Sequence, residues 1–105
     1  MATSKDFAEF CAETVEELGS IRYRKMFGEY LLYIDEKPVL LICDNSVFIK
    51  KLECLSSFDL PCGVPYEGAK EHYVLPIDDR ECVLSACRAA LPFLTVPRKR
   101  IKAQR

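Results

Sequence analysis

The first apolar stripe of the chain has the spacing of an amphipathic helix. Its members recur every three or four positions, at Phe7, Phe10, Cys11, Thr14, Val15 and Leu18. Acidic side chains occupy the other side of the same helical projection. Thr3 or Ser4 can cap the first turn, and Gly19 follows the last apolar position, as glycine commonly does after a helix. The pattern predicts a helix that packs this stripe, including the thiol of Cys11, against the rest of the fold.

Beyond Gly19 the apolar pattern becomes that of strands. Segments rich in β-branched, aromatic and aliphatic residues cover positions 21–27, 29–34, 39–43, 47–52 and, after an irregular stretch, 72–75. The connections after Ile34 and Cys43 are too short for a parallel crossover, so we expect an antiparallel meander. The run 39–43 has no polar alternation, which indicates a central strand that is covered on both faces or lies at a subunit contact.

A second amphipathic helix is predicted near the C-terminus. Asp78 or Asp79 can cap it, and Pro92 should end or kink it near residue 91. Its inward positions are Val83, Cys87, Ala90 and, as a further candidate, Leu94. Antiparallel strands flanked by terminal helices favour a two-layer α+β domain over residues 1–96. We expect a sheet of about four to six strands with the N- and C-terminal helices packed on one face.

The charge of the chain is distributed unevenly, although the net charge is only −1. The last eight positions hold five of the 15 basic residues: Arg98, Lys99, Arg100, Lys102 and Arg105. Residues 97–105 are therefore expected to form a basic, flexible tail on an acidic body. Such a tail can contact a polyanion such as a nucleic acid through its phosphates, or it can serve only as a solvated terminus. The candidate polyanion-binding residues are these five.

Neither a membrane span nor an export signal is evident, since the longest apolar run, 39–43, is far too short to cross a bilayer. A cytoplasmic location is therefore expected, and with it six thiols rather than a disulfide framework. The cysteines are Cys11, Cys43, Cys54, Cys62, Cys82 and Cys87. They include no CxxC pair, and His72 is the single histidine, so no metal or other cofactor is expected. A catalytic cysteine paired with His72 is the least favoured function.

One short motif resembles that of a known family. Residues 24–33 read RKMFGEYLLY and are similar to the signature R-x-M-F-G-G-[YH]-G-[IL]-[YF] of the TfoX (Sxy) N-terminal domain family. The matching positions are Arg24, Met26, Phe27, Gly28, Tyr30 and Tyr33, whereas Glu29 and Leu31 replace glycines. The resemblance covers roughly residues 4–94 and implies a stand-alone N-domain with a secretion-chaperone-like α+β fold. It also implies a regulatory role, because full-length members are implicated in competence for DNA uptake.

The basic and aromatic residues of 22–28 have two readings. As a strand, the segment places Arg22, Arg24 and Met26 on one face and Tyr23, Lys25 and Phe27 on the other. The arginine stems can cover apolar surface while their heads meet the acidic first helix, or the segment can form part of a ligand or partner surface.

The function we expect is a regulatory or protein-interaction module that uses a sheet face or edge and has no catalytic activity. Its candidate partner surface comprises Tyr30, Tyr33 and Leu41, and its partner is another protein or a second copy, with a homodimer expected. The runner-up is a nucleic-acid-associated regulator that acts through the basic tail, and a small Cys/His enzyme is third.

Overall fold

The computed structural model describes residues 4–26 and 29–96. Its elements in chain order are α1 (Lys5–Thr14), the 3₁₀ helix η1 (Glu16–Leu18), β1 (Ile21–Met26), β2 (Glu29–Ile34), β3 (Lys37–Cys43), β4 (Ser46–Lys50), the 3₁₀ helix η2 (Glu53–Phe58), β5 (Cys62–Gly63), β6 (His72–Leu75), α2 (Arg80–Ala90) and the 3₁₀ helix η3 (Leu91–Phe93).

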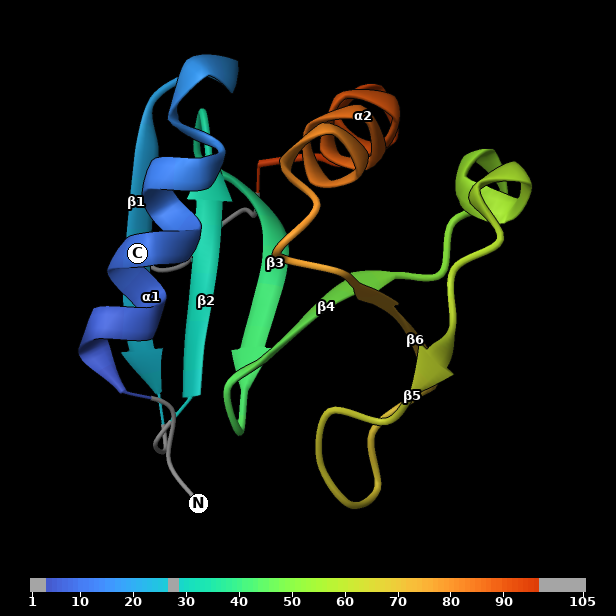
Figure 1. The fold of residues 1–105 in the computed structure, drawn as a ribbon, viewed down its shortest axis with the longest axis horizontal. Coiled ribbons are helices and arrows are strands. Elements are labelled where there is room, and N and C mark those ends of the chain that lie inside the picture. The colour runs from blue at the N-terminus through green and yellow to red at the C-terminus, as the bar shows by residue number, and fades with distance from the viewer. Residues whose placement is uncertain (1–3, 27–28, 97–105) are drawn as a thin grey trace, which may run out of the picture.

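The strands form one antiparallel sheet of six strands in the order β1-β2-β3-β4-β6-β5. Both α-helices lie over the same face of this sheet (Figure 1). This arrangement confirms the predicted α+β class, with the strand number at the upper end of the expected range. The predicted central segment is β3, which has two strands on one side and three on the other.

Side chains alternate between two sheet faces of different composition. Towards the helices point the residues of the main core, among them Leu32, Leu40 and Ile49, all of which are fully buried. The opposite side of the sheet is covered by neither α-helix, and we call it the open face (Figure 1). The strand register places on it Arg22, Arg24, Leu31, Tyr33, Leu41, Phe48, Lys50, His72 and Val74.

The first helix begins where the sequence predicts and ends earlier. The Phe7 amide donates to Ser4 Oγ at 3.2 Å, which caps the first turn. The α-helix ends at Thr14, because Val15 leaves helical geometry and the chain tightens into η1 before Gly19. Phe10 is 46% exposed and lies at the margin of the stripe, whereas Ala8 is fully buried. The buried side of α1 runs through Ala8, Cys11 and Thr14, and Phe10 lies beside it. The prediction that Phe10 faces the core was therefore wrong.

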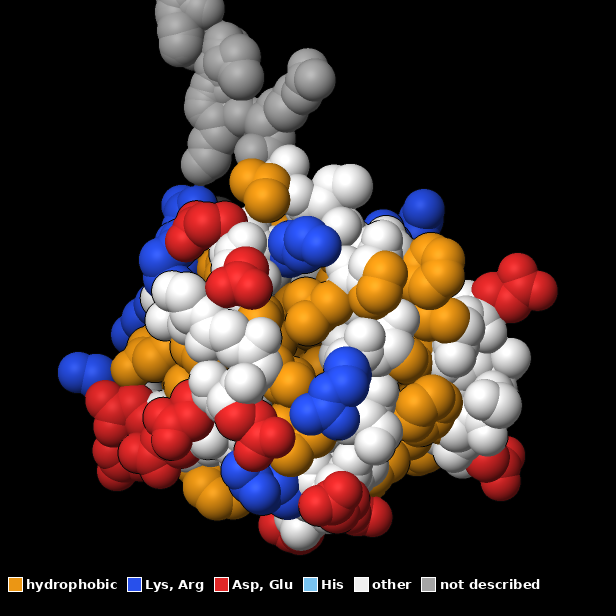
Figure 2. Space-filling view, turned by 90° about the horizontal axis from the view of Figure 1, so that it is seen from above, with side chains coloured by type: hydrophobic (Ala, Val, Ile, Leu, Met, Phe, Trp, Pro, Cys, Tyr) orange, Lys and Arg blue, Asp and Glu red, His pale blue; other side chains and the backbone are white. Residues whose placement is uncertain are grey.

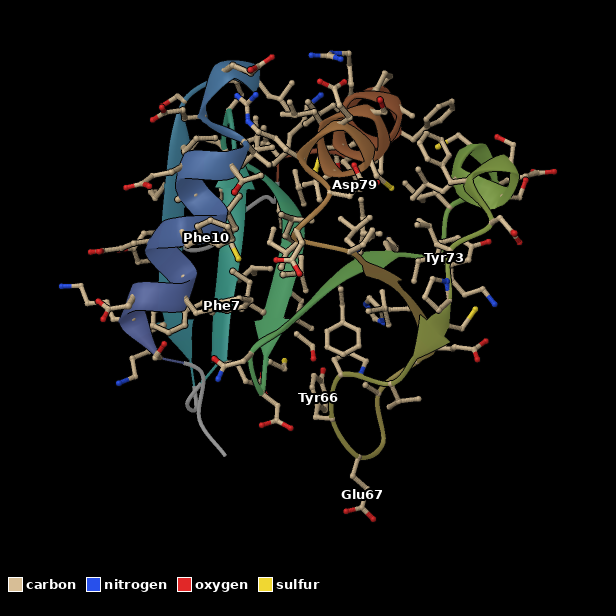
Figure 3. The ribbon with its side chains drawn as sticks, in the orientation of Figure 1. Phe7, Phe10, Tyr66, Glu67, Tyr73 and Asp79 are labelled. Carbon is tan, nitrogen blue, oxygen red and sulfur yellow. The ribbon has the colours of Figure 1, made fainter. Side chains whose placement is uncertain are left out.

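The second helix has the boundaries that its capping residues predict. The Cys82 amide donates to Asp79 Oδ1 at 3.2 Å at the start of α2, where Figure 3 labels Asp79. The helix ends at Ala90, two residues before Pro92, which cannot donate to the helical ladder. Val83, Cys87 and Ala90 are fully buried as predicted.

Replacing Gly19 by alanine is expected to lower the free energy of unfolding by about 2 to 3 kcal/mol. Gly19 has φ +154° and ψ −160°, and a Cβ there would lie 2.7 Å from Asp35 Oδ2. The carboxylate of Asp35 would have to move away from the Ser20 amide, from which it accepts a hydrogen bond at 2.9 Å. Urea unfolding followed by circular dichroism measures the loss.

Gly68→Ala is the matched control for Gly19→Ala. Gly68 also has a positive φ, +90°, but nothing lies within 4 Å of a Cβ placed there. Backbone strain alone should then cost about 1 kcal/mol. Equal losses in the two variants would show that contact with Asp35 contributes nothing.

Candidate interaction surface

The open face is hollowed where β3 and β4 separate. Their pairing stops at Leu40 and Ile49, although β3 begins three residues before Leu40. The hollow has a volume of about 530 Å³. Its apolar lining comes mainly from the sheet and includes Leu31, Pro38, Val39, Leu41 and Phe48. Lys50, Lys51, Lys70, Glu71 and His72 line it on the β4 and β6 side.

The third side of the hollow comes from the segment that follows α2. Lys37 Nζ donates to the carbonyl oxygen of Leu91 at 3.0 Å and so ties the end of α2 to the start of β3. Phe93, Leu94 and Thr95 then line the hollow, and Phe93 is 65% exposed. Leu94 contacts the core in part, as its place in the predicted stripe suggested. The lining role of Phe93 was not predicted.

The apolar lining that the sheet contributes forms the floor of the hollow. Phe48 is part of this floor and is 7% exposed. Its ring extends towards Gly63 on β5, the strand beyond β6. A Cβ on Gly63 would lie 3.4 Å from the Phe48 ring and 3.1 Å from Cγ2 of Val74. Leu31 and Leu41, which are opposite each other across β2 and β3, remain partly exposed.

Arg22 covers the ring of Tyr33 at the β1 side of the open face. Its guanidinium carbon lies 4.2 Å from the ring centroid, and its Nη2 is 2.8 Å from Glu36 Oε1. The hydrogen bond with Glu36 raises the pKa of Arg22. The sequence led us to expect that the guanidinium groups of β1 contact the acidic first helix, and for Arg22 this expectation was wrong. The strand alternation turns it away from α1, and Glu36 in the β2–β3 turn is its partner.

The predicted partner surface divides between the two faces. Tyr33 and Leu41 lie on the open face, but Tyr30 points into the helix-covered core, where 5% of it is exposed and its ring contacts Tyr23 edge-on. Period-two alternation separates residues 30 and 33, so grouping Tyr30 with Tyr33 and Leu41 was wrong.

The motif that resembles the TfoX domain likewise spans both faces. Arg24 is exposed on the open face, and Met26 ends β1. Phe27 and Gly28 lie outside the described residues.

The rim formed by β4 and β6 carries cations in two different settings. Lys51 Nζ lies 2.9 Å from Glu71 Oε1, and this hydrogen bond raises the Lys51 pKa. It also lies 5.6 Å from the ring centroid of Tyr73, which Figure 3 labels on β6. Lys50 and Lys70 are exposed, and neither forms an ion pair within residues 4–26 and 29–96.

His72 also stands on this rim, opposite Lys50 in the register. Its Nδ1 lies 2.8 Å from the carbonyl oxygen of Lys70, a contact that is satisfied when Nδ1 carries the hydrogen. Cys62 is on the neighbouring strand, but it pairs with Tyr73, while His72 pairs with Gly63. The side chains of Cys62 and His72 therefore point to opposite faces of the sheet, and the structure does not bring this Cys/His pair together.

Three cysteines are held as protonated thiols by their surroundings. Burial raises the pKa of Cys11 and of Cys87 to about 12. Burial also raises the pKa of Cys43 to about 12, with the charge of Glu29 and a hydrogen bond to it contributing. All six cysteines are free thiols. Among the described residues, no three His, Cys, Asp or Glu side chains are grouped as a metal site.

The candidate polyanion-binding residues Arg98, Lys99, Arg100, Lys102 and Arg105 lie outside the described part of the chain. Within the described part, no helix is both long and apolar enough to cross a membrane.

The fold and the hollow define a small α+β protein with one apolar, partly basic open sheet face. No family model matches the chain. It is similar to the uncharacterized 12.7 kDa protein in the trpE 5′ region of Spirochaeta aurantia, with 38% identity over 76 residues. The match covers 70% of this chain and 66% of the relative, whose name states no activity. Membership of the TfoX family stays a prediction.

Proposed function

We propose that this protein is a non-catalytic regulatory or protein-interaction module that recognises its partner with the open face of the sheet. The observation that carries the proposal is the hollow of about 530 Å³ with its apolar floor. Leu31 and Leu41 keep part of their surface exposed there, although α1 and α2 cover the other face of the same strands. Burying such surface against a partner is favourable at about 25 cal/mol per Å² of apolar area.

An exposed aromatic ring at the rim supports the same assignment. Phe93 is 65% exposed beside the floor, so a partner that covers it removes a large apolar ring from water. A regulatory role in the cytoplasm accords with the resemblance to the TfoX N-terminal domain and forms part of the proposal. The partner is another protein or a second copy of the chain.

Photo-crosslinking inside cells tests which face is used. A benzoylphenylalanine at Leu41 should give a crosslinked adduct, and one at Phe93 should give an adduct of the same mass. The matched control is Glu13, which is exposed on α1 on the other side of the molecule and should give none. Mass spectrometry of the adduct distinguishes a second copy from another protein.

Two results would count against the proposal. An adduct at Glu13 with none at Leu41 would move recognition to the helical side. Absence of adducts at both Leu41 and Phe93, with the variants folded, would remove the open face as a recognition surface.

A further inference from the structure

Resting on the proposed function, we propose that the hollow binds an acidic segment of a different protein, one that inserts apolar side chains between flanking carboxylates. The proposal goes beyond the existence of an interaction face, because it states the chemistry of the occupant. It is carried by the charge around the apolar floor, by the charge of the opposite side of the molecule, and by the aliphatic character of the lining.

On both sides of its apolar floor, the open face carries exposed cations that form no ion pair within the described residues. Two of its carboxylates, Glu36 and Glu71, are already paired with Arg22 and Lys51. The exposed cations that remain are Arg24 on β1 and Lys50 and Lys70 at the rim. Glu29 is the carboxylate near the β1 end, and it is hydrogen-bonded to the thiol of Cys43. A partner that supplies carboxylates on both sides of an apolar insert would satisfy these cations.

The opposite side of the molecule has the opposite charge. Acidic side chains are exposed along α1 and η1, at Asp6, Glu9, Glu13, Glu16 and Glu17. Figure 2 shows Asp and Glu side chains gathered on the side of α1. Glu17 pairs with Arg80 and Arg88 of α2, and the other four leave the exposed side of α1 and η1 acidic. The described chain is thus acidic along α1 and η1 and basic around its sheet hollow. This polarity orients an approaching acidic segment towards the hollow and away from α1.

The same charges disfavour a symmetric pair of copies joined through this face. In a two-fold dimer each residue near the axis meets its own counterpart, so Lys50 and Lys70 would be brought towards the like charges of the second copy. Like charges brought together across an interface cost affinity. The homodimer expected from the sequence is therefore less favourable through this face than a complex with an acidic partner.

The lining also favours a protein segment over a nucleic acid. Binding of single strands relies on aromatic faces on which bases can stack. Here the floor consists largely of aliphatic groups, Phe48 is only 7% exposed, and the ring of Tyr33 is already covered by Arg22. Phe93 is the one exposed phenyl ring among the described lining residues, and a single ring does not form a row of stacking platforms for successive bases. Leucine, valine and phenylalanine side chains of a peptide match such a floor, and acidic side chains match its rim.

Selection from a random peptide library tests the proposal without a known partner. Twelve-residue peptides displayed on phage are selected on the immobilised full chain. Enriched sequences should combine Asp or Glu with Leu, Val or Phe. Fluorescence polarisation of the most enriched peptide should then give a Kd that rises at least tenfold in Lys50→Glu/Lys70→Glu and in Leu41→Asp. It should change less than twofold in Lys5→Glu/Lys25→Glu, which alters the net charge equally at exposed sites away from the hollow.

Four outcomes would overturn the inference. They are enrichment of basic peptides, enrichment of none, loss of binding only when residues 97–105 are removed, and tight binding of a dT20 oligonucleotide that also depends on Lys50 and Lys70. A crosslink from Leu41 to a second copy, with no acidic peptide selected, would retain the proposed function and refute this inference. Loss of crosslinks at Leu41 together with selection of peptides that ignore Leu41→Asp would refute both.

Discussion

Leu40→Ala is expected to lower the free energy of unfolding by about 3 kcal/mol. Leu40 is fully buried in the central strand β3, opposite Ile49 on β4 and Leu32 on β2, and belongs to the core beneath the helices. Removal of its side-chain carbons forfeits their burial and leaves a cavity that the packed neighbours on both strands cannot fill. Urea unfolding at neutral pH, followed by circular dichroism, measures the change as a shift of the midpoint at constant slope.

The neighbouring residue provides the control for Leu40→Ala. Leu41 lies on the same strand but on the open face, where it keeps part of its surface exposed. Leu41→Ala should therefore cost about 1 kcal/mol, less than half as much. Equal losses at residues 40 and 41 would show that both faces of β3 are equally buried. That result would contradict an open face as well as the role given to Leu40.

The strand pattern could be predicted closely because it depends on local chemistry. The segments predicted at 29–34 and 72–75 coincide with β2 and β6, and the predicted division of Arg22 and Arg24 from Tyr23 agrees with the register. Period-two alternation fixes which residues share a face, and a short connection fixes an antiparallel pair. The two-residue strand β5 carries too little pattern to be recognised, since it is defined by its pairing with β6.

The site was predicted less completely because it is formed by tertiary contacts. Tyr33 and Leu41 could be assigned to a surface from apolar character alone, but that reasoning also selected Tyr30, which the alternation places in the core. The third side of the hollow depends on the segment after α2 lying beside β3, where Lys37 holds the carbonyl of Leu91. Pro92 signalled the end of the helix, yet no local pattern shows where the chain goes next.

The charge distribution around the hollow was likewise predicted only in part. The sequence indicated an acidic body and a basic terminus, but the two lysines of the hollow that form no ion pair within the described residues, Lys50 and Lys70, are separated by 20 positions. Antiparallel pairing of β4 with β6 brings these parts of the chain together. A basic rim assembled from distant positions cannot be read from charge runs, which identify only the cations that are adjacent in sequence.

Raising the pH from 8 to 11 is expected to destabilise the protein markedly, with Cys87 alone contributing about 3 kcal/mol. Burial raises the pKa of Cys87 from 9.0 to about 12. Between these values the unfolded chain releases the thiol proton and the folded chain keeps it. The unfolded state therefore binds fewer protons, and its free energy falls relative to the folded state as pH rises. The contribution is fully present below pH 9 and declines up to about pH 12.

The alkaline effect can be isolated by substituting the thiol. In a reducing buffer, Cys87→Ala should be less stable than the natural chain at pH 8, because a small cavity replaces the sulfur. The difference should shrink as pH rises and change sign near pH 11, since alanine has no proton to lose. Val83→Ala, which opens a small cavity under the same helix but removes no titratable group, should leave the pH dependence of unfolding unchanged. Parallel stability curves for Cys87→Ala and the natural chain would mean that the Cys87 thiol ionises as readily in the folded state as in the unfolded one.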